Sequence, residues 1–258
     1  MKGQIDMESF IGWIGGKRML RKHILERFPQ EGVGRYIEVF GGAGWVLFAK
    51  EKQSGQMEVF NDLDGELINL YRCIKYHCEA VQDELNWLLS SREQFYDYKE
   101  QSTMRGMTDI QRAARFFYLI KISFGNDRRT FATSSKSVDH AKEYLKKIQE
   151  RLQGVVIERK DFADLLKVYD RKDALFYLDP PYVGTEKYYN VSYVTEDHQR
   201  LADSLKKIKG RFILSYNDDP MIYNLYDGYT IEKITRKSTL SANGNNKADF
   251  VEVIIRNY

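Results

Sequence analysis

The sequence lacks the features that mark membrane, secreted and disulfide-rich proteins. Its 258 residues contain no run that approaches 18 uncharged apolar residues, and no hydrophobic stretch follows the first six positions. A membrane span and a secretion signal are therefore not expected. The two cysteines, Cys73 and Cys78, lie five residues apart and cannot form a disulfide framework, which suits a reducing compartment. We expect a soluble, cytoplasmic protein.

The chain is also poor in net charge, repeats and proline. A formal charge of +3 is too small for a disordered chain, while 43% hydrophobic and 14% aromatic residues supply enough apolar mass for a sizeable core. We find no internal repeat or low-complexity tract, and two of the four prolines are adjacent, at Pro180 and Pro181. At this length, one domain carrying an insertion is the expected organisation.

Basic residues gather in the middle of the chain. Residues 99–160 hold 14 lysines and arginines against seven acids, so the small net charge hides a basic segment and a mildly acidic remainder. Such an asymmetry is expected where one part of a protein holds a polyanion, and it also arises on a solvated helical face.

Short runs rich in β-branched and aromatic residues predict seven strands, and helical patterns lie between most of them. Strands that alternate with helices imply a mostly parallel, doubly wound α/β sheet. Only a loop separates the last two strands, so we expect them to form an antiparallel pair at an edge of the sheet. The predicted strands cover 36–40, 57–60, 155–158, 174–178, 212–216, 229–235 and 250–255, with helices at 65–76, 162–168 and 196–208.

Residues 71–153 break this alternation. Helical periodicity appears at 79–89, 108–122 and 139–152, with no convincing strand between. We therefore predict an inserted, mainly helical subdomain over 71–153 and one α/β domain built from 1–70 and 154–258. In such a sheet ligands bind beyond the carboxyl ends of the strands, so the loops after the strands are the expected location of the site.

Glycine-rich and acidic loops follow the first two predicted strands. The first strand runs into a turn with Gly42 and Gly44, where the backbone can approach a ligand closely. Asp62 follows the second strand, where its carboxylate can accept hydrogen bonds from ribose hydroxyls. Leu47 stands where the dinucleotide fingerprint needs a small residue, which weakens a pyrophosphate site. Together the loops predict an adenosine-containing ligand, although each alone is also typical of a tight turn or a helix cap.

The apolar strand at 174–178 runs directly into Asp179, Pro180, Pro181 and Tyr182. The fixed φ of the prolines ends the ladder and holds the Asp179 carboxylate, the Pro180 carbonyl and the Tyr182 ring in a stiff turn. This set suits an exocyclic nucleobase amine, because two oxygen acceptors favour its pyramidal, reactive form and the ring can stack on an extruded base. Alone the motif is also typical of a turn that ends a strand, but after an apolar strand and with the two loops upstream it predicts chemistry on a flipped base.

Over nearly its whole length the chain resembles the DNA adenine methylases (Dam type, D12 class), which methylate adenine N6 with S-adenosylmethionine. The family's motifs occur in the family's order. Residues 13–17 resemble its N-terminal cofactor motif, 40–44 its methionine-side loop, Asp62 its ribose carboxylate and 179–182 its catalytic motif. Residues 215–218 stand at its base-pocket loop, and 236–238 with 243–244 resemble its C-terminal loop.

The resemblance implies a Rossmann-like methyltransferase sheet, S-adenosyl-L-methionine as cofactor and double-stranded DNA as substrate, with the target adenine flipped. It makes the helical insertion a target-recognition subdomain. It makes Asp179, Pro180, Pro181 and Tyr182 the catalytic residues. The cofactor contacts that it implies are Trp13, Lys17, Phe40, Gly42, Gly44, Asp62, Asp161, Phe162 and Asp179, with Asp161 and Phe162 flanking the cofactor's adenine.

Residues 124–131 stand where the family enters its target-recognition hairpin. The paired guanidiniums of Arg128 and Arg129 suit phosphate or the guanine edge, and they are also typical of charge at a helix end. The segment that follows is shorter than in the family, so GATC is not assigned as the target. The tyrosine-rich loop 185–190 either closes over DNA or packs on the surface. The expected DNA contacts are Asn126, Arg128, Arg129, Tyr188, Asn217, Lys237 and Asn243.

Other functions stay open on the sequence alone. They are methylation of cytosine N4 or of a base in structured RNA, a DNA-binding regulator without turnover and, more remotely, a nicotinamide-dependent enzyme. Cys73, His77 and Cys78 fall short of the four ligands of a structural zinc, so no metal is expected. The resemblance also admits a cognate restriction endonuclease as a functional partner without a stable complex.

Overall fold

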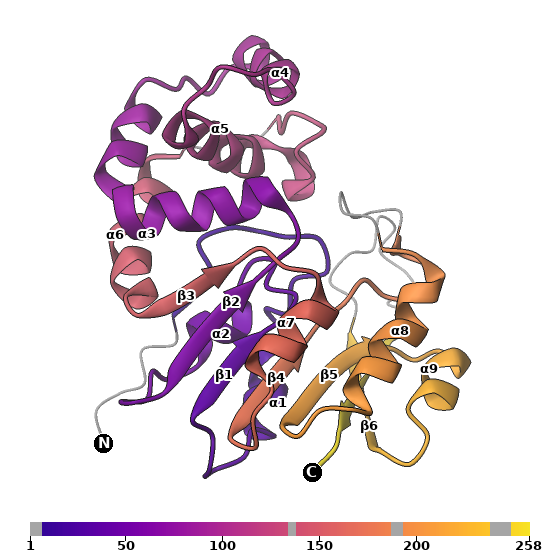
Figure 1. Cartoon of the computed structure of the whole chain (residues 1–258). Helices are drawn as coiled ribbons and strands as arrows, with labels where there is room; N and C mark the ends of the chain where they lie inside the picture. The colour runs from indigo at the N-terminus through magenta and orange to yellow at the C-terminus, as the bar shows by residue number, and fades with distance from the viewer. Residues whose placement is uncertain (1–6, 134–137, 187–192, 238–248) are drawn as a thin grey trace.

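A seven-stranded sheet forms the centre of the protein (Figure 1). The computed structural model describes residues 7–133, 138–186, 193–237 and 249–258. The strands lie in the order β3-β2-β1-β4-β5-β7-β6. In chain order they are β1 (Arg35–Glu38), β2 (Met57–Asn61), β3 (Val155–Glu158), β4 (Ala174–Leu178), β5 (Arg211–Asn217), β6 (Thr230–Lys237) and β7 (Asp249–Arg256).

The first five strands are parallel, and β7 runs antiparallel to both of its neighbours, β5 and β6. This arrangement confirms the doubly wound α/β sheet and the antiparallel edge pair that the sequence predicts. The last strand does not extend the edge, because it inserts between β5 and β6. The direction of winding reverses between β1 and β4, and ligands of such sheets bind beyond the carboxyl ends of the strands at that point.

The two faces of the sheet carry separate apolar cores, because side chains alternate along each strand. Leu175 and Tyr177 of β4 pack in the first core, and Phe176 and Leu178 pack in the second. Figure 1 shows α7, α8 and α9 in front of the sheet. Helices of the first core include α1 (Arg21–Glu26), α2 (Trp45–Ala49) and α3 (Gly65–Asn86), and those of the second are α7 (Phe162–Tyr169), α8 (Thr195–Leu205) and α9 (Pro220–Leu225).

Helix α3 extends beyond the sheet into a group of helices, α4 (Arg92–Gln101), α5 (Asp109–Ile122) and α6 (Asp139–Leu152), in the stretch predicted to be helical (Figure 1). The sequence predicts two helices, at 65–76 and 79–89. The structure confirms this division, because non-helical backbone at His77 (φ −137°, ψ 37°) forms a kink that separates two helical segments of α3. The sequence does not predict α4, because Phe95 is its one buried side chain and no apolar stripe forms.

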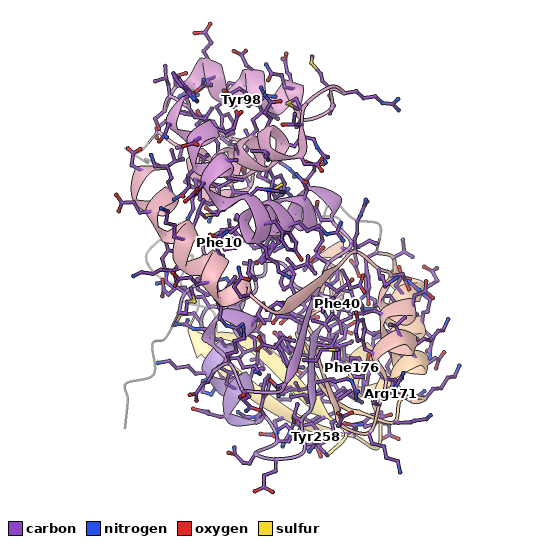
Figure 2. All side chains as sticks on the ribbon, turned by 60° about the vertical axis from the view of Figure 1, so that its left-hand side comes forward. Phe10, Phe40, Tyr98, Arg171, Phe176 and Tyr258 are labelled. Atoms are coloured by element: carbon purple, nitrogen blue, oxygen red, sulfur yellow. The ribbon has the colours of Figure 1, made fainter. Side chains whose placement is uncertain are left out.

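Aromatic side chains join the helical group to the sheet. Phe10 packs edge-on against Phe48 of α2 and Tyr71 of α3, with ring centres 5.8 and 5.1 Å apart. It also stacks on Phe117 of α5 at 6.2 Å. Figure 2 shows Phe10 at this junction and Tyr98 far out in the helical group. The N-terminal segment that leads to the pocket is therefore held between the two parts.

Candidate active site

A pocket lies beyond the carboxyl ends of β1, β2, β3 and β4, where the winding of the sheet reverses. Its walls come from the N-terminal segment, from the loops after these strands, from α8 and from the loop after α5. The pocket thus lies at the edge of the sheet where the sequence analysis expects a site. Of the expected site residues, those that line the pocket are Trp13, Lys17, Phe40, Gly42, Asp62, Asn126, Arg128, Asp161, Phe162, Asp179 and Pro181.

The glycine turn between β1 and α2 has left-handed backbone at Gly42 (φ +49°) and Gly44 (φ +66°). A Cβ on Gly42 would lie 3.0 Å from the Trp13 ring, and one on Gly44 would lie 2.9 Å from the Tyr71 hydroxyl. Both approaches are tighter than ordinary van der Waals contact. Gly42 thus lets Trp13 lie against the turn on the pocket side, whereas Gly44 is the N-cap of α2 and lies outside the pocket lining.

Asp62 ties the end of β2 to the glycine turn. Its carboxylate accepts hydrogen bonds from the backbone N–H of Gly42 at 2.9 Å and of Asp64 at 2.8 Å. Burial raises the pKa of Asp62 to about 6, and the two amides oppose that shift. The cap of α3 is Asp64, which accepts from the amides of Glu66 and Leu67. Asp62 itself is therefore not the helix cap, and its carboxylate lies at the pocket wall.

Asp179 begins the turn after β4 and has two close partners. Its Oδ1 lies 2.8 Å from Lys17 Nζ and accepts a hydrogen bond of 2.8 Å from Ser215 Oγ. Lys17 also donates to the Gly15 carbonyl at 2.9 Å. Burial raises the pKa of Asp179, while Lys17 and Ser215 oppose the rise. The structure thus brings a predicted cofactor residue and a predicted catalytic residue together in one ion pair.

Tyr182 is buried beside this ion pair. Its hydroxyl donates to Glu252 Oε1 at 2.6 Å, and Lys17 Nζ lies 4.5 Å from the centre of its ring. Glu252 belongs to β7 and its Oε1 lies 3.7 Å from the same Nζ. The sequence pattern does not predict a role for Glu252, and its one signal is a carboxyl group within an apolar strand. Lys17 therefore faces two carboxyl groups, those of Asp179 and Glu252.

Helix α8 closes the side of the pocket that carries Asp161 and Phe162. Arg200 donates to both carboxylate oxygens of Asp161 at 2.8 Å, and its guanidinium lies 4.0 Å from the centre of the Phe162 ring. Burial would raise the pKa of Asp161, but Arg200 and the amide of Ala163 lower it overall. Arg200 lies 39 positions from Asp161 in the chain, so no local pattern reveals it.

The residues expected to contact DNA have different surroundings. Asn126 and Arg128 line the pocket, whereas Arg129 is exposed. Asn217 accepts from the backbone N–H of Val183 at 3.1 Å and donates to its carbonyl at 3.3 Å, so it fixes the segment directly after Tyr182. Tyr188 and Asn243 lie outside the described residues, as does the side chain of Lys237.

Neither a metal centre nor a membrane span is found in the described ranges. No group of three or more His, Cys, Asp or Glu side chains there could hold a metal ion. Cys73 and Cys78 are buried free thiols, and burial raises the pKa of each, which disfavours the thiolate that a metal requires. No helix there is long and apolar enough to cross a membrane.

The doubly wound sheet, its antiparallel β7 and the pocket beside Asp179 define a Rossmann-like α/β methyltransferase. The family model for the D12 class N6 adenine-specific DNA methyltransferases matches residues 13–241. The chain belongs to this family, and the protein is an adenine-specific DNA methyltransferase. Family membership thus decides against the cytosine, RNA and nicotinamide alternatives.

Similar proteins align over almost the whole chain. A type II methyltransferase of Lactococcus lactis subsp. cremoris is 29% identical over 282 residues, which cover 100% of this chain and 98% of that protein. The retron Ec67 DNA adenine methylase of Escherichia coli is 24% identical, with 96% and 90% covered. The DNA adenine methylase of Haemophilus influenzae is 22% identical, with 98% and 95% covered. The similarity therefore spans the helical group as well as the sheet.

Proposed function

We propose that the protein transfers a methyl group from S-adenosylmethionine to N6 of an adenine flipped out of double-stranded DNA. The observation that carries this proposal is the position of Asp179. Its carboxylate lies on the pocket wall with Lys17, and the same residue begins the catalytic turn. A donor in the pocket and an amine at the turn would meet at this one side chain.

The side chains of the pocket fit S-adenosylmethionine. Asp62 offers carboxylate oxygens for ribose hydroxyls, and the rings of Phe40 and Phe162, 5.7 Å apart, offer apolar surface for an adenine. Lys17 faces two carboxyl groups, and this excess of acid suits a cationic sulfonium. S-adenosylmethionine, when bound, supplies an electrophilic methyl group. We assign its binding to Gly44, which shapes the turn, and to the expected cofactor residues that line the pocket, namely Trp13, Lys17, Phe40, Gly42, Asp62, Asp161, Phe162 and Asp179.

The residues of the catalytic turn orient the target amine. An exocyclic nucleobase amine is weakly nucleophilic, because its lone pair is delocalised into the ring. The Asp179 carboxylate and the Pro180 carbonyl accept its two N–H bonds and favour the pyramidal nitrogen. Tyr182 stacks on the flipped base, and its hydroxyl bond to Glu252 holds the ring in place before the base arrives. The amine loses its proton after attack, so no general base is needed.

We further propose that the helical group over 71–153 recognises the target sequence. Its basic charge and the exposed Arg129 support this role. The type II names of the relatives support a protective function beside a restriction endonuclease that shares the target without forming a stable complex. We therefore also propose a cytoplasmic location, where the protected DNA would lie.

Incubation with S-adenosylmethionine and unmethylated DNA, with RNA in parallel, tests the reaction. Mass spectrometry of the digested nucleosides should detect N6-methyladenine from DNA alone. Methyl groups on cytosine, or in RNA alone, would contradict the proposed substrate, and no methyl group in any sample would contradict the enzymatic function. The Asp179→Ala variant is the matched control for contaminating activity.

A further inference from the structure

Two adjacent arginines of the loop after α5 lie in different surroundings. Arg129 is exposed, whereas the Arg128 side chain is only 19% exposed and lines the pocket. The guanidinium of Arg128 lies 4.9 Å from the Trp13 ring centre and 4.8 Å from that of Phe116. Arg128 has left-handed backbone (φ +60°), and its N–H donates to Ser123 Oγ at 3.0 Å. The fold of the loop thus directs Arg128 into the pocket and leaves Arg129 outside.

The other described cations of the pocket lie elsewhere. Lys17 is paired with Asp179, and Arg200 is paired with Asp161 on the side expected to hold adenine. Lys160 directly precedes Asp161 on that same side. Arg128 instead faces Asp64, whose Oδ2 is 3.7 Å from Nη1, longer than a hydrogen bond. Its guanidinium is therefore positioned to take up a stronger anionic partner.

The ring on which Arg128 stacks lies against the glycine turn, since a Cβ on Gly42 would touch Trp13. Arg128 therefore lies on the glycine-turn side of the pocket. We propose that Arg128 binds the carboxylate of the methionine part of S-adenosylmethionine, an inference that rests on the proposed cofactor. This carboxylate is the anionic group of the cofactor, and a guanidinium fork matches it with two parallel N–H bonds. Arg128 is then a cofactor residue that belongs to the helical insertion, not a DNA contact.

Two ligands that share a nucleoside separate this role from a structural one. S-adenosylhomocysteine carries the carboxylate, and 5′-methylthioadenosine lacks the amino-acid part. Isothermal titration of the full chain without DNA should show that Arg128→Ala weakens S-adenosylhomocysteine about tenfold or more and changes 5′-methylthioadenosine less than about twofold. Arg129→Ala is the matched control and should leave both affinities unchanged.

Each other outcome has a definite meaning. Equal weakening of both ligands by Arg128→Ala would overturn the carboxylate contact, because it would assign Arg128 to the nucleoside or to the pocket wall. If Arg128→Ala does not fold, Arg128→Lys provides the same test, with a smaller selective loss of affinity for S-adenosylhomocysteine. Unchanged binding of S-adenosylhomocysteine to folded Arg128→Lys would also overturn the contact. Wild-type protein that binds neither ligand would contradict the proposed cofactor itself.

Discussion

At the scale of single residues, Asp179 connects the pocket to the catalytic turn through its ion pair with Lys17. We expect Asp179→Ala to lower turnover by about 10²- to 10³-fold, because the target amine loses a preorganised acceptor. Transfer of a radiolabelled methyl group to DNA measures the loss. The matched control is Asp173→Ala, because Asp173 directly precedes the first residue of β4 as Asp179 directly follows the last. This variant should retain turnover. More than about a tenth of wild-type turnover in Asp179→Ala would contradict the assigned role.

Glu38 is a buried carboxyl group at the end of β1. It accepts a hydrogen bond from the Tyr36 hydroxyl at 2.8 Å, and burial raises its pKa from 4.5 to about 8. Between these two pH values the folded protein keeps a proton that the unfolded chain releases. The free energy of unfolding should therefore fall as the pH rises through this window, and Glu38→Gln should remove that part of the decline.

Urea unfolding at pH 5 and pH 8 measures this difference. Relative to wild type, Glu38→Gln should gain roughly 3–4 kcal/mol of stability between pH 5 and pH 8, because this interval covers most of the pKa shift and one pKa unit corresponds to about 1.4 kcal/mol. A difference between the two proteins that stays constant from pH 5 to pH 8 would be inconsistent with a protonated Glu38.

At the scale of elements, β7 brings Glu252 to the catalytic turn, because this strand inserts between β5 and β6. Glu252→Gln keeps the shape of the side chain but weakens its bond from Tyr182 and its attraction for Lys17. We expect a lower kcat with little change in the KM for the cofactor. The effects of Glu252→Gln and Tyr182→Phe on kcat should be non-additive, with a coupling free energy of about 0.5–3 kcal/mol in a double-mutant cycle.

Glu232 of the neighbouring β6 provides the control for Glu252. It pairs with Arg27 and Arg256 and not with Lys17 or Tyr182, so Glu232→Gln should lower stability without lowering kcat. Additive effects of Glu252→Gln and Tyr182→Phe would show that the hydroxyl bond does not position the ring.

The elements differ in how well the sequence predicts them. Strand β4 matches its predicted range, since all five of its residues are buried and apolar and a turn with two prolines ends it. Helix α4 is missed because its stability comes from the Ser91 cap and from Phe95, which leave no periodic stripe. The predicted break near His77 is present as a kink in α3, and buried residues on both sides of the kink belong to the same apolar core.

The residues of the candidate site also differ in how far the sequence alone can predict them. Residues 179–182 can be grouped from the sequence alone, because four consecutive residues of one turn lie close together whatever the rest of the fold is. Glu252 is 70 positions from Tyr182, and Arg200 approaches Asp161 from another helix, so only the fold brings these groups together. The pocket-facing direction of Arg128 depends on its left-handed backbone, which no periodicity reveals.

At the scale of the whole molecule, the chain divides into a basic middle and a mildly acidic remainder. Affinity for DNA should fall steeply with salt, because bound lysines and arginines release counterions from phosphates. Arg129→Ala should weaken binding and reduce the slope of log K against log salt by about 1. Lys147→Ala, on α6 beside β3 (Figure 1), should leave the slope unchanged. Fluorescence anisotropy between about 50 and 200 mM salt measures both slopes, and equal slopes would contradict DNA contact by Arg129.

Helix α3 begins at the pocket, where Asp64 caps it, and crosses residue 71 without interruption. A graft that exchanged residues 71–153 between relatives would cut this helix in its second turn and separate the cap from Tyr71, which packs under the glycine turn. Joints at 64 and at Gly154, whose left-handed backbone already separates α6 from β3, keep the helix whole. A recombined enzyme of new sequence specificity would therefore inherit one wall of the proposed cofactor pocket together with the helices that we propose to recognise the target sequence.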